Sequence, residues 1–314
     1  MEEQIAIVSG YTKKRKKYNK SLYVMMIIPV LLTFVYAYLP LGGLIAAFQR
    51  FDLAKGFLGS KLVGLENFSY LFGYSNFWQT VFNTFYISIM KLCLQMVIPL
   101  IVALMLNEVA NSRYRTSIQT MVYLPHFISW VIVAGMLREL LSLDGSVNNI
   151  LASFGIEPVM FLIDKTLFPF VIVLSDAWKS FGFDTIMIMA ALTQINPNLY
   201  EAATMDGAGR WKKTLHITIP GIMPIIILVF ILKLGSIVNN AGFDQVVNLY
   251  SPMVYETGDI LDTLTYRLAF DSSANAIPQY DIATAVGLMR SVVSFVLVSV
   301  SYFIAHKVAD YRIF

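Results

Sequence analysis

The sequence is poor in charge, because only 14% of its 314 residues are Asp, Glu, Lys or Arg. Soluble domains usually carry about 25% of such residues. Hydrophobic residues make up 57% of the chain, and the mean hydropathy is +0.65. So little charge cannot cover the surface of a soluble protein, and the composition therefore indicates an integral membrane protein. The small net charge of +3 gives no reason to expect a nucleic-acid partner.

Residues that carry chemistry are also scarce. The single cysteine, Cys93, lies in an apolar run, which excludes a disulfide within the chain and a thiolate metal cluster. The three histidines are far apart and form no HxxxH or HExxH pair, so no metal site is expected. The sequence has no GxxxxGK[ST] loop and cannot bind ATP in that manner. A membrane enzyme such as a transferase is disfavoured, because Gly-x-Ser-x-Gly, a Ser-His constellation and a paired carboxylate motif are all missing.

Six apolar stretches are long enough to cross a membrane, which takes about 20 mostly apolar residues. They are residues 22–48, 79–106, 117–141, 167–192, 221–239 and 282–305. The first exceeds the ~7–15 residues of a cleavable signal h-region, so we expect it to be retained as a span. Prolines in or near the spans are compatible with a bundle, because neighbouring helices can satisfy the freed backbone groups. We therefore predict an all-α membrane protein with six transmembrane helices.

The distribution of Lys and Arg predicts the orientation of these spans through the positive-inside rule. With the N-terminus in the cytoplasm, the inner segments hold thirteen Lys and Arg residues and the outer segments hold five. Both termini are therefore expected in the cytoplasm. The expected organisation is a basic segment 1–21, a six-span transmembrane domain 22–305 and a tail 306–314, without a tandem repeat. The acidic and aromatic loop 240–281 is expected to lie across the outer mouth of the bundle.

A polar segment, residues 193–220, separates the fourth and fifth predicted spans on the cytoplasmic side. Asn196-Pro197 is a strong helix start, with Asn as N-cap and Pro at the first helical position. The stretch PNLYEAATM is therefore predicted to form a helix, which Asp206-Gly207 ends in a turn. A second helix, roughly AGRWKKTLH, then leads to the next span. Local physics leaves two interpretations: an amphipathic loop on the membrane surface, or a helix–turn–helix that a partner protein grips.

The same segment resembles a known signature. The spacing of Glu201-Ala202-Ala203, Gly207 and Ile217-x-Ile219-Pro220 is similar to the cytoplasmic EAA motif of binding-protein-dependent ABC importer permeases, with Ile219 at the usual Leu position. Asp206 and Ala208 fit the common DGA form of that motif. The stretches that resemble the carbohydrate class, and within it the subgroup for complex oligosaccharides, are YVMMIIPVLLTFVYAYLPLGGLIAAFQRF, GLENFSYLF, NTFYIS, VYETGDILDTLTYRLAF and YDIATAVGLMRSVVSF.

The resemblance implies a type I importer fold with a coupling helix within residues 196–220 that docks into a cleft on a separate ATPase. It implies that Glu201 makes a charge contact there, that Gly207 allows the bend, and that Ala202, Ala203 and Ala208 form the close-packed face beside Asp206. The chain would be no enzyme and would hold no cofactor, since ATP and Mg are bound by the ATPase.

The resemblance also implies the partners and the location of the chain. The expected partners are a second homologous permease subunit, two copies of an ABC ATPase, an extracellular or periplasmic solute-binding protein, an oligosaccharide substrate and membrane lipid. The expected location is the bacterial plasma membrane. A six-span chain of this size would form half of the translocation pathway.

Charged residues within predicted spans are candidates for the pathway, because each costs ~2.5–3.5 kcal/mol at a helix centre. They are Lys91, Arg138, Glu139, Asp176, Lys179, Asp184, Lys233 and Arg290. The best cluster is SDAWKSFGF, residues 175–183, where polar Asp176 and Lys179 accompany Trp178 and Phe181, whose rings suit the C–H faces of a sugar. The polar residues expected to join them at the outer end of the fifth span are Asn239, Asn240 and Asp244. Alternatively, these residues are packing aromatics and a structural ion pair.

Two other functions compete with ATP-driven import. An ion-coupled secondary transporter of a small polar solute is compatible with the intramembrane carboxylates, although it would need a discontinuous helix or internal symmetry, and no repeat is present. A purely structural or sensory membrane subunit is disfavoured by the cytoplasmic signature.

Overall fold

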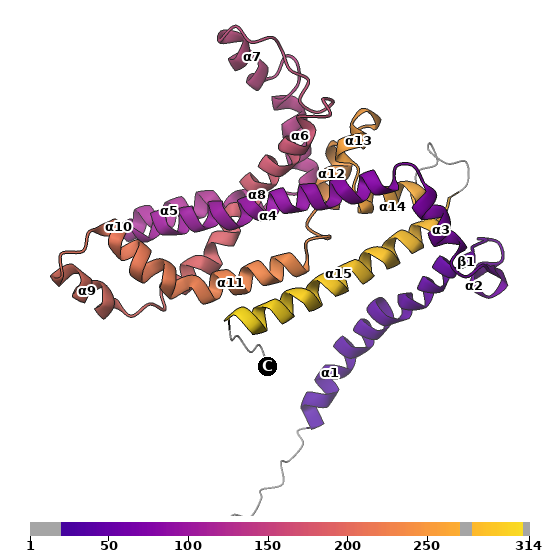
Figure 1. Cartoon of the computed structure of the whole chain (residues 1–314), viewed down its shortest axis with the longest axis horizontal. Coiled ribbons are helices and arrows are strands. Elements are labelled where there is room, and N and C mark those ends of the chain that lie inside the picture. Colours follow the sequence, from indigo (N-terminus) through magenta and orange to yellow (C-terminus); the bar gives the residue numbers. More distant parts are fainter. Residues whose placement is uncertain (1–19, 271–277, 310–314) are drawn as a thin grey trace, which may run out of the picture. The chain divides into compact units, whose positions relative to one another are not determined.

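A computed structural model describes residues 20–270 and 278–309, and nearly all regular structure within these ranges is helical (Figure 1). The chain divides into two units, residues 1–45 and 46–314. Most of the predicted basic segment 1–21 and the last five residues of the predicted tail lie outside the described residues.

The first unit is a continuous apolar helical stretch. Helix α1 (Lys20–Thr33) continues through a π-helical turn, η1 (Phe34–Tyr38), into the 3-10 helix η2 (Leu39–Phe48), whose end begins the second unit. The 26 residues Tyr23–Phe48 are long and apolar enough to span a membrane. The helix expected at residues 22–48 is thus confirmed.

The second unit consists of helices and one short hairpin. The hairpin strands β1 (Gln49–Arg50) and β2 (Lys61–Leu62) pair antiparallel around α2 (Gly56–Gly59). The elements that follow are α3 (Glu66–Gly73), α4 (Phe77–Asn107), α5 (Ser112–Tyr123), η3 (Leu124–Phe127), α6 (Trp130–Leu140), α7 (Ser146–Ser153), α8 (Phe168–Leu192), α9 (Pro197–Met205), α10 (Arg210–Lys213), η4 (Thr214–Thr218), α11 (Ile219–Gly235), α12 (Phe243–Leu249), η5 (Pro252–Val254), α13 (Tyr255–Gly258), α14 (Leu261–Phe270) and α15 (Tyr280–Ala309).

Four helices among the described residues are long and apolar enough to cross a membrane: Tyr23–Phe48, Phe77–Asn107, Arg210–Gly235 and Tyr280–Phe303. A bent pair formed by α5–η3 and α6 would make a fifth span. Helix α8 has 25 residues, or about 37 Å, but three charged side chains in its central part make it more polar than the others. The chain is therefore a helical membrane protein with four to five candidate spans.

The third predicted span, residues 117–141, is not one straight helix. The α5–η3 and α6 segments meet at an angle of 97°. Pro125 removes a backbone donor, and Ser129 caps a new helix by accepting a hydrogen bond from the Val131 N–H at 3.1 Å. The sequence contains both signals, but its continuous hydrophobicity hides the break.

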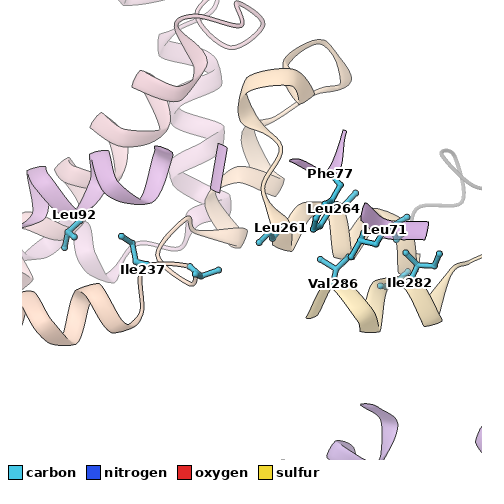
Figure 2. Close-up of a cluster of buried hydrophobic side chains, with 12 residues drawn as sticks. Leu71, Phe77, Leu92, Ile237, Leu261, Leu264, Ile282 and Val286 are labelled. Atoms are coloured by element: carbon cyan, nitrogen blue, oxygen red, sulfur yellow. The ribbon is translucent and has the colours of Figure 1, made fainter. Parts of the chain in front are cut away.

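Helices α4 and α8 pack along each other, and α11 packs along α15 (Figure 1). Figure 2 shows one hydrophobic cluster of this unit, where Phe77, Leu264 and Val286 bring α4, α14 and α15 together. A second cluster places Ile222 of α11 among Ala103 of α4 and residues of α8. Helix α8 therefore packs along α4 and also contacts α11.

A close crossing holds α8 against the end of α5. Gly182 of α8 is buried, and a Cβ atom added there would overlap the carbonyl oxygen of Val122. Because the obstacle is backbone, it cannot move aside as a flexible side chain would. The crossing therefore requires glycine at position 182.

We expect Gly182→Ala to lower stability by about 1–3 kcal/mol, because the added methyl group forces the two helices apart. The measurement is the thermal unfolding temperature of the purified protein in detergent. Gly287→Ala is the matched control, since no atom lies within 4 Å of its added Cβ and alanine favours helix. Equal unfolding temperatures for the two variants would contradict the close crossing.

Candidate coupling module and transport pathway

The 196–220 module begins with the helix that the sequence predicts. Helix α9 covers Pro197–Met205, and the side chain of Asn196 accepts a hydrogen bond from the Asn198 N–H at 3.0 Å. This N-cap and the proline that follows it satisfy the first turn of the helix. The predicted helix PNLYEAATM is therefore confirmed in both its start and its end.

The turn after α9 depends on Gly207, whose φ is +76°. The Gly207 N–H donates to the Thr204 carbonyl at 3.0 Å, and the Ala208 N–H donates to the Ala203 carbonyl at 2.8 Å. This pair of hydrogen bonds is a Schellman motif, which closes a helix through a left-handed residue. No atom lies within 4 Å of a Cβ added to Gly207, so the backbone conformation, and not space, requires glycine.

The second helix of the module differs from the prediction. It begins at Arg210 and runs without a stop to Gly235, a continuous helix of 26 residues that we call the 210–235 rod. The fifth predicted span, residues 221–239, therefore has no helix start of its own, because the π turn η4 leads into it and the Ile219 N–H donates to the Thr214 carbonyl. Pro220 has no N–H to donate, and the wider π turn before it lets the helix continue without that hydrogen bond.

Several side chains of the module are exposed. Glu201, Ala202 and Asp206 lie on the surface, and Ala203 and Ala208 are half-buried. Glu201 makes no ion pair with any residue that the structure describes. The large apolar side chains exposed around them are Leu199, Met205 and Trp211. The module thus presents a carboxylate, small side chains and apolar side chains on one short helix–turn–helix.

The module is fastened to the rod. The Tyr200 hydroxyl lies 2.9 Å from the Thr218 hydroxyl, which joins α9 to η4. Lys213 Nζ donates to the Thr204 hydroxyl at 3.3 Å. These two contacts join α9 to the first turns of the rod, so the structure ties the two helices of the module together.

Of the predicted pathway residues, Asp176 and Asn240 meet at a polar network between α4, α8 and α11. The Asp176 carboxylate accepts a hydrogen bond from Gln95 Nε2 at 2.8 Å and lies 3.6 Å from Lys91 Nζ. Asn240 Nδ2 donates to Gln95 Oε1 at 3.2 Å. Lys91 is fully buried and also donates to the Ala241 carbonyl at 2.9 Å. The charge of Asp176 is therefore balanced inside the protein.

Lys179 points to a different neighbour. Its Nζ donates to the His126 carbonyl at 2.6 Å and lies 5.5 Å from the centre of the Trp130 ring, at the break between α5 and α6. Phe183 stacks on the His126 ring with centroids 4.1 Å apart. Lys179 makes no ion pair among the described residues, and its ammonium group lies beside aromatic rings.

The remaining predicted pathway residues are dispersed. Trp178 lines an apolar groove of about 400 Å³ between α6 and α8, away from Asp176. Phe181 is half-buried on α8, and its carbonyl accepts a hydrogen bond from Thr185. Asn239 accepts a hydrogen bond from Arg290, and Asp244 is exposed in the first turn of α12. The structure thus separates Trp178 and Asp244 from the polar network.

A family model described as binding-protein-dependent transport system inner membrane component matches residues 95–313. The chain belongs to this family. It is a multi-pass permease of a binding-protein-dependent ABC importer, and the family consists of transport components rather than enzymes.

One relative and two solved structures match nearly the whole permease. It is 35% identical over 297 residues to the polygalacturonan/rhamnogalacturonan transport system permease protein YteP of Bacillus subtilis (strain 168), covering 94% of this chain and 91% of the relative. A bacterial ABC transporter involved in the import of the acidic polysaccharide alginate contains a chain with a TM-score of 0.83 and 37% identity, covering 92% and 96%. The alginate transporter in complex with alginate pentasaccharide-bound periplasmic protein gives a TM-score of 0.82 and 38% identity, covering 92% and 94%.

The structure adds polar residues that sequence reasoning missed. Gln95 and Gln245 are neutral, and therefore escape a search for charged residues within spans. Gln245 is fully buried, accepts a hydrogen bond from Lys91 Nζ at 2.6 Å and donates to Ser175 Oγ at 2.8 Å. Tyr200 and Thr218, which fasten α9 to the rod, gave no sequence signal either.

A buried ion pair anchors the 255–270 segment of the permease on α4. Arg267 lies 2.5 Å from the Asp259 carboxylate, with side-chain exposures of 9% and 2%. The Arg267 guanidinium also lies 4.1 Å from the centre of the Tyr255 ring, and Asn83 of α4 donates to the Asp259 carbonyl at 3.2 Å. Burial raises the pKa of the Asp259 carboxyl above its usual value, although Arg267 acts to lower it.

We expect Arg267→Met to destabilise the permease by about 3–5 kcal/mol at neutral pH, because it leaves Asp259 buried without a counter-charge. The measurement is denaturant unfolding in detergent. Arg50→Met is the control, since Arg50 pairs with Glu66 at an exposed position where an ion pair contributes about 1 kcal/mol or less. Similar losses in the two variants would contradict the anchoring role.

The loss in Arg267→Met should also depend on pH. Without Arg267 the pKa of folded Asp259 rises further, so the folded state binds a proton more tightly than the unfolded state. Stability from such a group is present at low pH and is lost as the pH rises through the raised pKa. The difference from the wild type should therefore shrink as the pH falls from neutral towards about 4.

Proposed function

We propose that this permease forms half of the translocation pathway of an ATP-driven oligosaccharide importer in the bacterial plasma membrane. A second homologous permease subunit completes the pathway, two copies of an ABC ATPase bind ATP and Mg, and an extracellular or periplasmic solute-binding protein delivers the substrate. The observation that carries the proposal is the 196–220 module. An exposed carboxylate and small side chains on a rigid helix–turn–helix are joined to a 26-residue rod.

In this proposal the permease has six spans with both termini in the cytoplasm and lipid around the bundle. The bent α5–η3–α6 segment serves as the third span and α8 as the fourth. The length of α8 and the pairing of its carboxylates by Lys91 and Lys233 support this assignment. The Lys and Arg bias supports the orientation.

The 196–220 module is the proposed docking element for the ATPase. Glu201 and Asp206 supply charge, Ala202, Ala203 and Ala208 allow close approach, and Gly207 sets the angle between α9 and the rod. When the ATPase subunits close, the module moves and the rod carries that motion into the membrane as a rigid body.

Substitution at Gly207 tests the docking role. Gly207→Val should abolish ATP-driven uptake into vesicles, because a β-branched residue is strained at a φ of +76° and the module loses its turn. Glu201→Arg should also abolish uptake, because it reverses the docking charge. Gly207→Asn is the matched control and should retain most activity, since asparagine tolerates the left-handed conformation. Normal uptake by Gly207→Val and Glu201→Arg in correctly inserted complexes would refute the role.

The substrate class is proposed to be acidic oligosaccharides. The named substrates of the similar proteins, polygalacturonan, rhamnogalacturonan and the acidic polysaccharide alginate, support this choice. Within the permease, Lys179 supplies a positive charge beside Trp130 and His126, at the break of the third span. A carboxylate would pair with the ammonium group while the sugar ring stacks on an aromatic face. Asp176, Phe181, Asn239 and Asn240 are proposed to flank this path.

A comparison of charged and neutral substrates tests Lys179. Wild-type transporter should prefer an acidic oligosaccharide over the same molecule with its carboxyl groups reduced. Lys179→Gln should weaken uptake of the acidic form by about tenfold or more, because a charge-assisted hydrogen bond is lost, and should leave the reduced form unchanged. Lys179→Arg should keep the preference. An unchanged preference in Lys179→Gln would remove this residue from the pathway.

A further inference from the structure

Gln95 joins three helices through one side-chain amide. From α4, its oxygen accepts hydrogen bonds from Lys233 Nζ of the rod at 3.1 Å and from Asn240 at 3.2 Å. Its nitrogen donates to the Asp176 carboxylate of α8 at 2.8 Å. Lys233 also donates to Asp184 of α8 at 2.9 Å. We call Gln95, Asp184 and Lys233 the Gln95 clasp.

The clasp is largely shielded from solvent. The side chains of Lys233 and Asp184 are 21% and 18% exposed, and Gln95 is 7% exposed. In such surroundings hydrogen bonds are electrostatically stronger than in water and hold their geometry. The charges of Lys233 and Asp184 balance each other, and Gln95 uses both ends of its amide. The clasp therefore fixes the direction of the rod as well as its distance from α8.

Outside the clasp the buried contacts between the rod and the α4–α8 pair are apolar, and the ion pair of Arg210 with Glu108 at the end of α4, 3.7 Å apart, is exposed and contributes about 1 kcal/mol or less. Ile222 of the rod packs among Ala103 of α4 and Ile188 and Leu192 of α8. Contacts of this kind are non-directional, so they restrain the rotation of a helix less than hydrogen bonds do. The apolar contacts therefore keep the rod close, and the clasp adds the directional contacts that couple its rotation to α4 and to the central part of α8.

Movement of the module reaches the clasp along the rod. Tyr200 ties α9 to Thr218, and the helix continues unbroken from Arg210 to Gly235. Lys233 lies 23 residues beyond Arg210, which corresponds to about 35 Å of helix. A displacement imposed on α9 is thus delivered far from the module, at the point where Lys233 meets α4 and α8.

We propose that the Gln95 clasp is the joint that transmits movement of the 196–220 module to the pathway helices α4 and α8. This inference rests on the proposed function. Gln95, Asp184 and Lys233 are positioning residues in this role, because they act through the helices that they join. Gln95 extends the joint to Asp176, so the orientation of a proposed pathway residue follows the rod.

The test compares transport with ATP hydrolysis in the complete importer, reconstituted with its partner permease, ATPase and binding protein. Single substitutions leave an uncompensated charge and impair folding, so the test variant is Lys233→Met with Asp184→Leu, which removes both charges together. The measured quantity is the amount of oligosaccharide transported per ATP hydrolysed. We expect this ratio to fall about fivefold or more while ATP hydrolysis stimulated by the binding protein persists.

An exposed ion pair provides the matched control. Lys165 and Glu256 lie 2.5 Å apart with side-chain exposures of 57% and 64%, and neither belongs to the clasp or the module. The double variant Lys165→Met with Glu256→Leu removes the same charges and should keep the wild-type ratio. Gln95→Leu should lower the ratio as the clasp variant does, because it cuts the links to Lys233 and Asp176.

The proposal that the clasp transmits movement would be overturned by a clasp variant that assembles with the ATPase and transports the wild-type amount of oligosaccharide per ATP. The proposal would also be overturned if the Lys165 and Glu256 control lowered the amount transported per ATP to the same extent, since the effect would then not be specific to the clasp. Wild-type complex that hydrolyses ATP without importing any oligosaccharide would refute the proposed function itself. The two failures are distinguished because the first appears in the variant alone and the second in the wild type.

Discussion

A charge inside hydrocarbon has to be satisfied by the protein, and α8 is the helix on which this constraint acts most strongly. Asp176, Lys179 and Asp184 lie along its central part. Lys91 and Gln95 of α4 contact the Asp176 carboxylate. The His126 carbonyl, between α5 and α6, accepts a hydrogen bond from Lys179, and Lys233 pairs with Asp184. The neighbours of α8 are thereby fixed. The module that follows α8 in the chain therefore connects α8 to the rod, and these two helices are already joined by the pair of Asp184 and Lys233.

Much of this architecture could be predicted from local signals in the sequence. Helix α9, its Asn196 cap and the turn at Gly207 depend on residues within a few positions of each other, and the sequence predicts all three. Long apolar runs predict most of the spans because length and hydropathy are properties of one segment. The docking role of Glu201 and its neighbours stays a prediction, since it depends on a partner.

The remaining features depend on contacts between distant segments. The Gln95 hydrogen bonds to Asp176 and Asn240 join residues 81 and 145 positions apart, and no pattern within one helix reveals them. The sequence places Trp178 with Asp176 because they are close in the chain, but they leave α8 in different directions. The 97° bend before α6 was hidden by hydrophobicity that continues across it.

The π turn at Thr214–Thr218 has a consequence for the spacing of the whole module. Such a turn holds about one residue more than an α-helical turn, and each residue of an α-helix rotates the chain by about 100°. Deleting one residue there would make the helix regular and would swing α9, with Glu201, about a quarter of the way around the rod. The direction that α9 faces is thus set by a residue count. A substitution that keeps the length of this turn leaves the direction of α9 unchanged, whereas a change of its length rotates α9 about the rod.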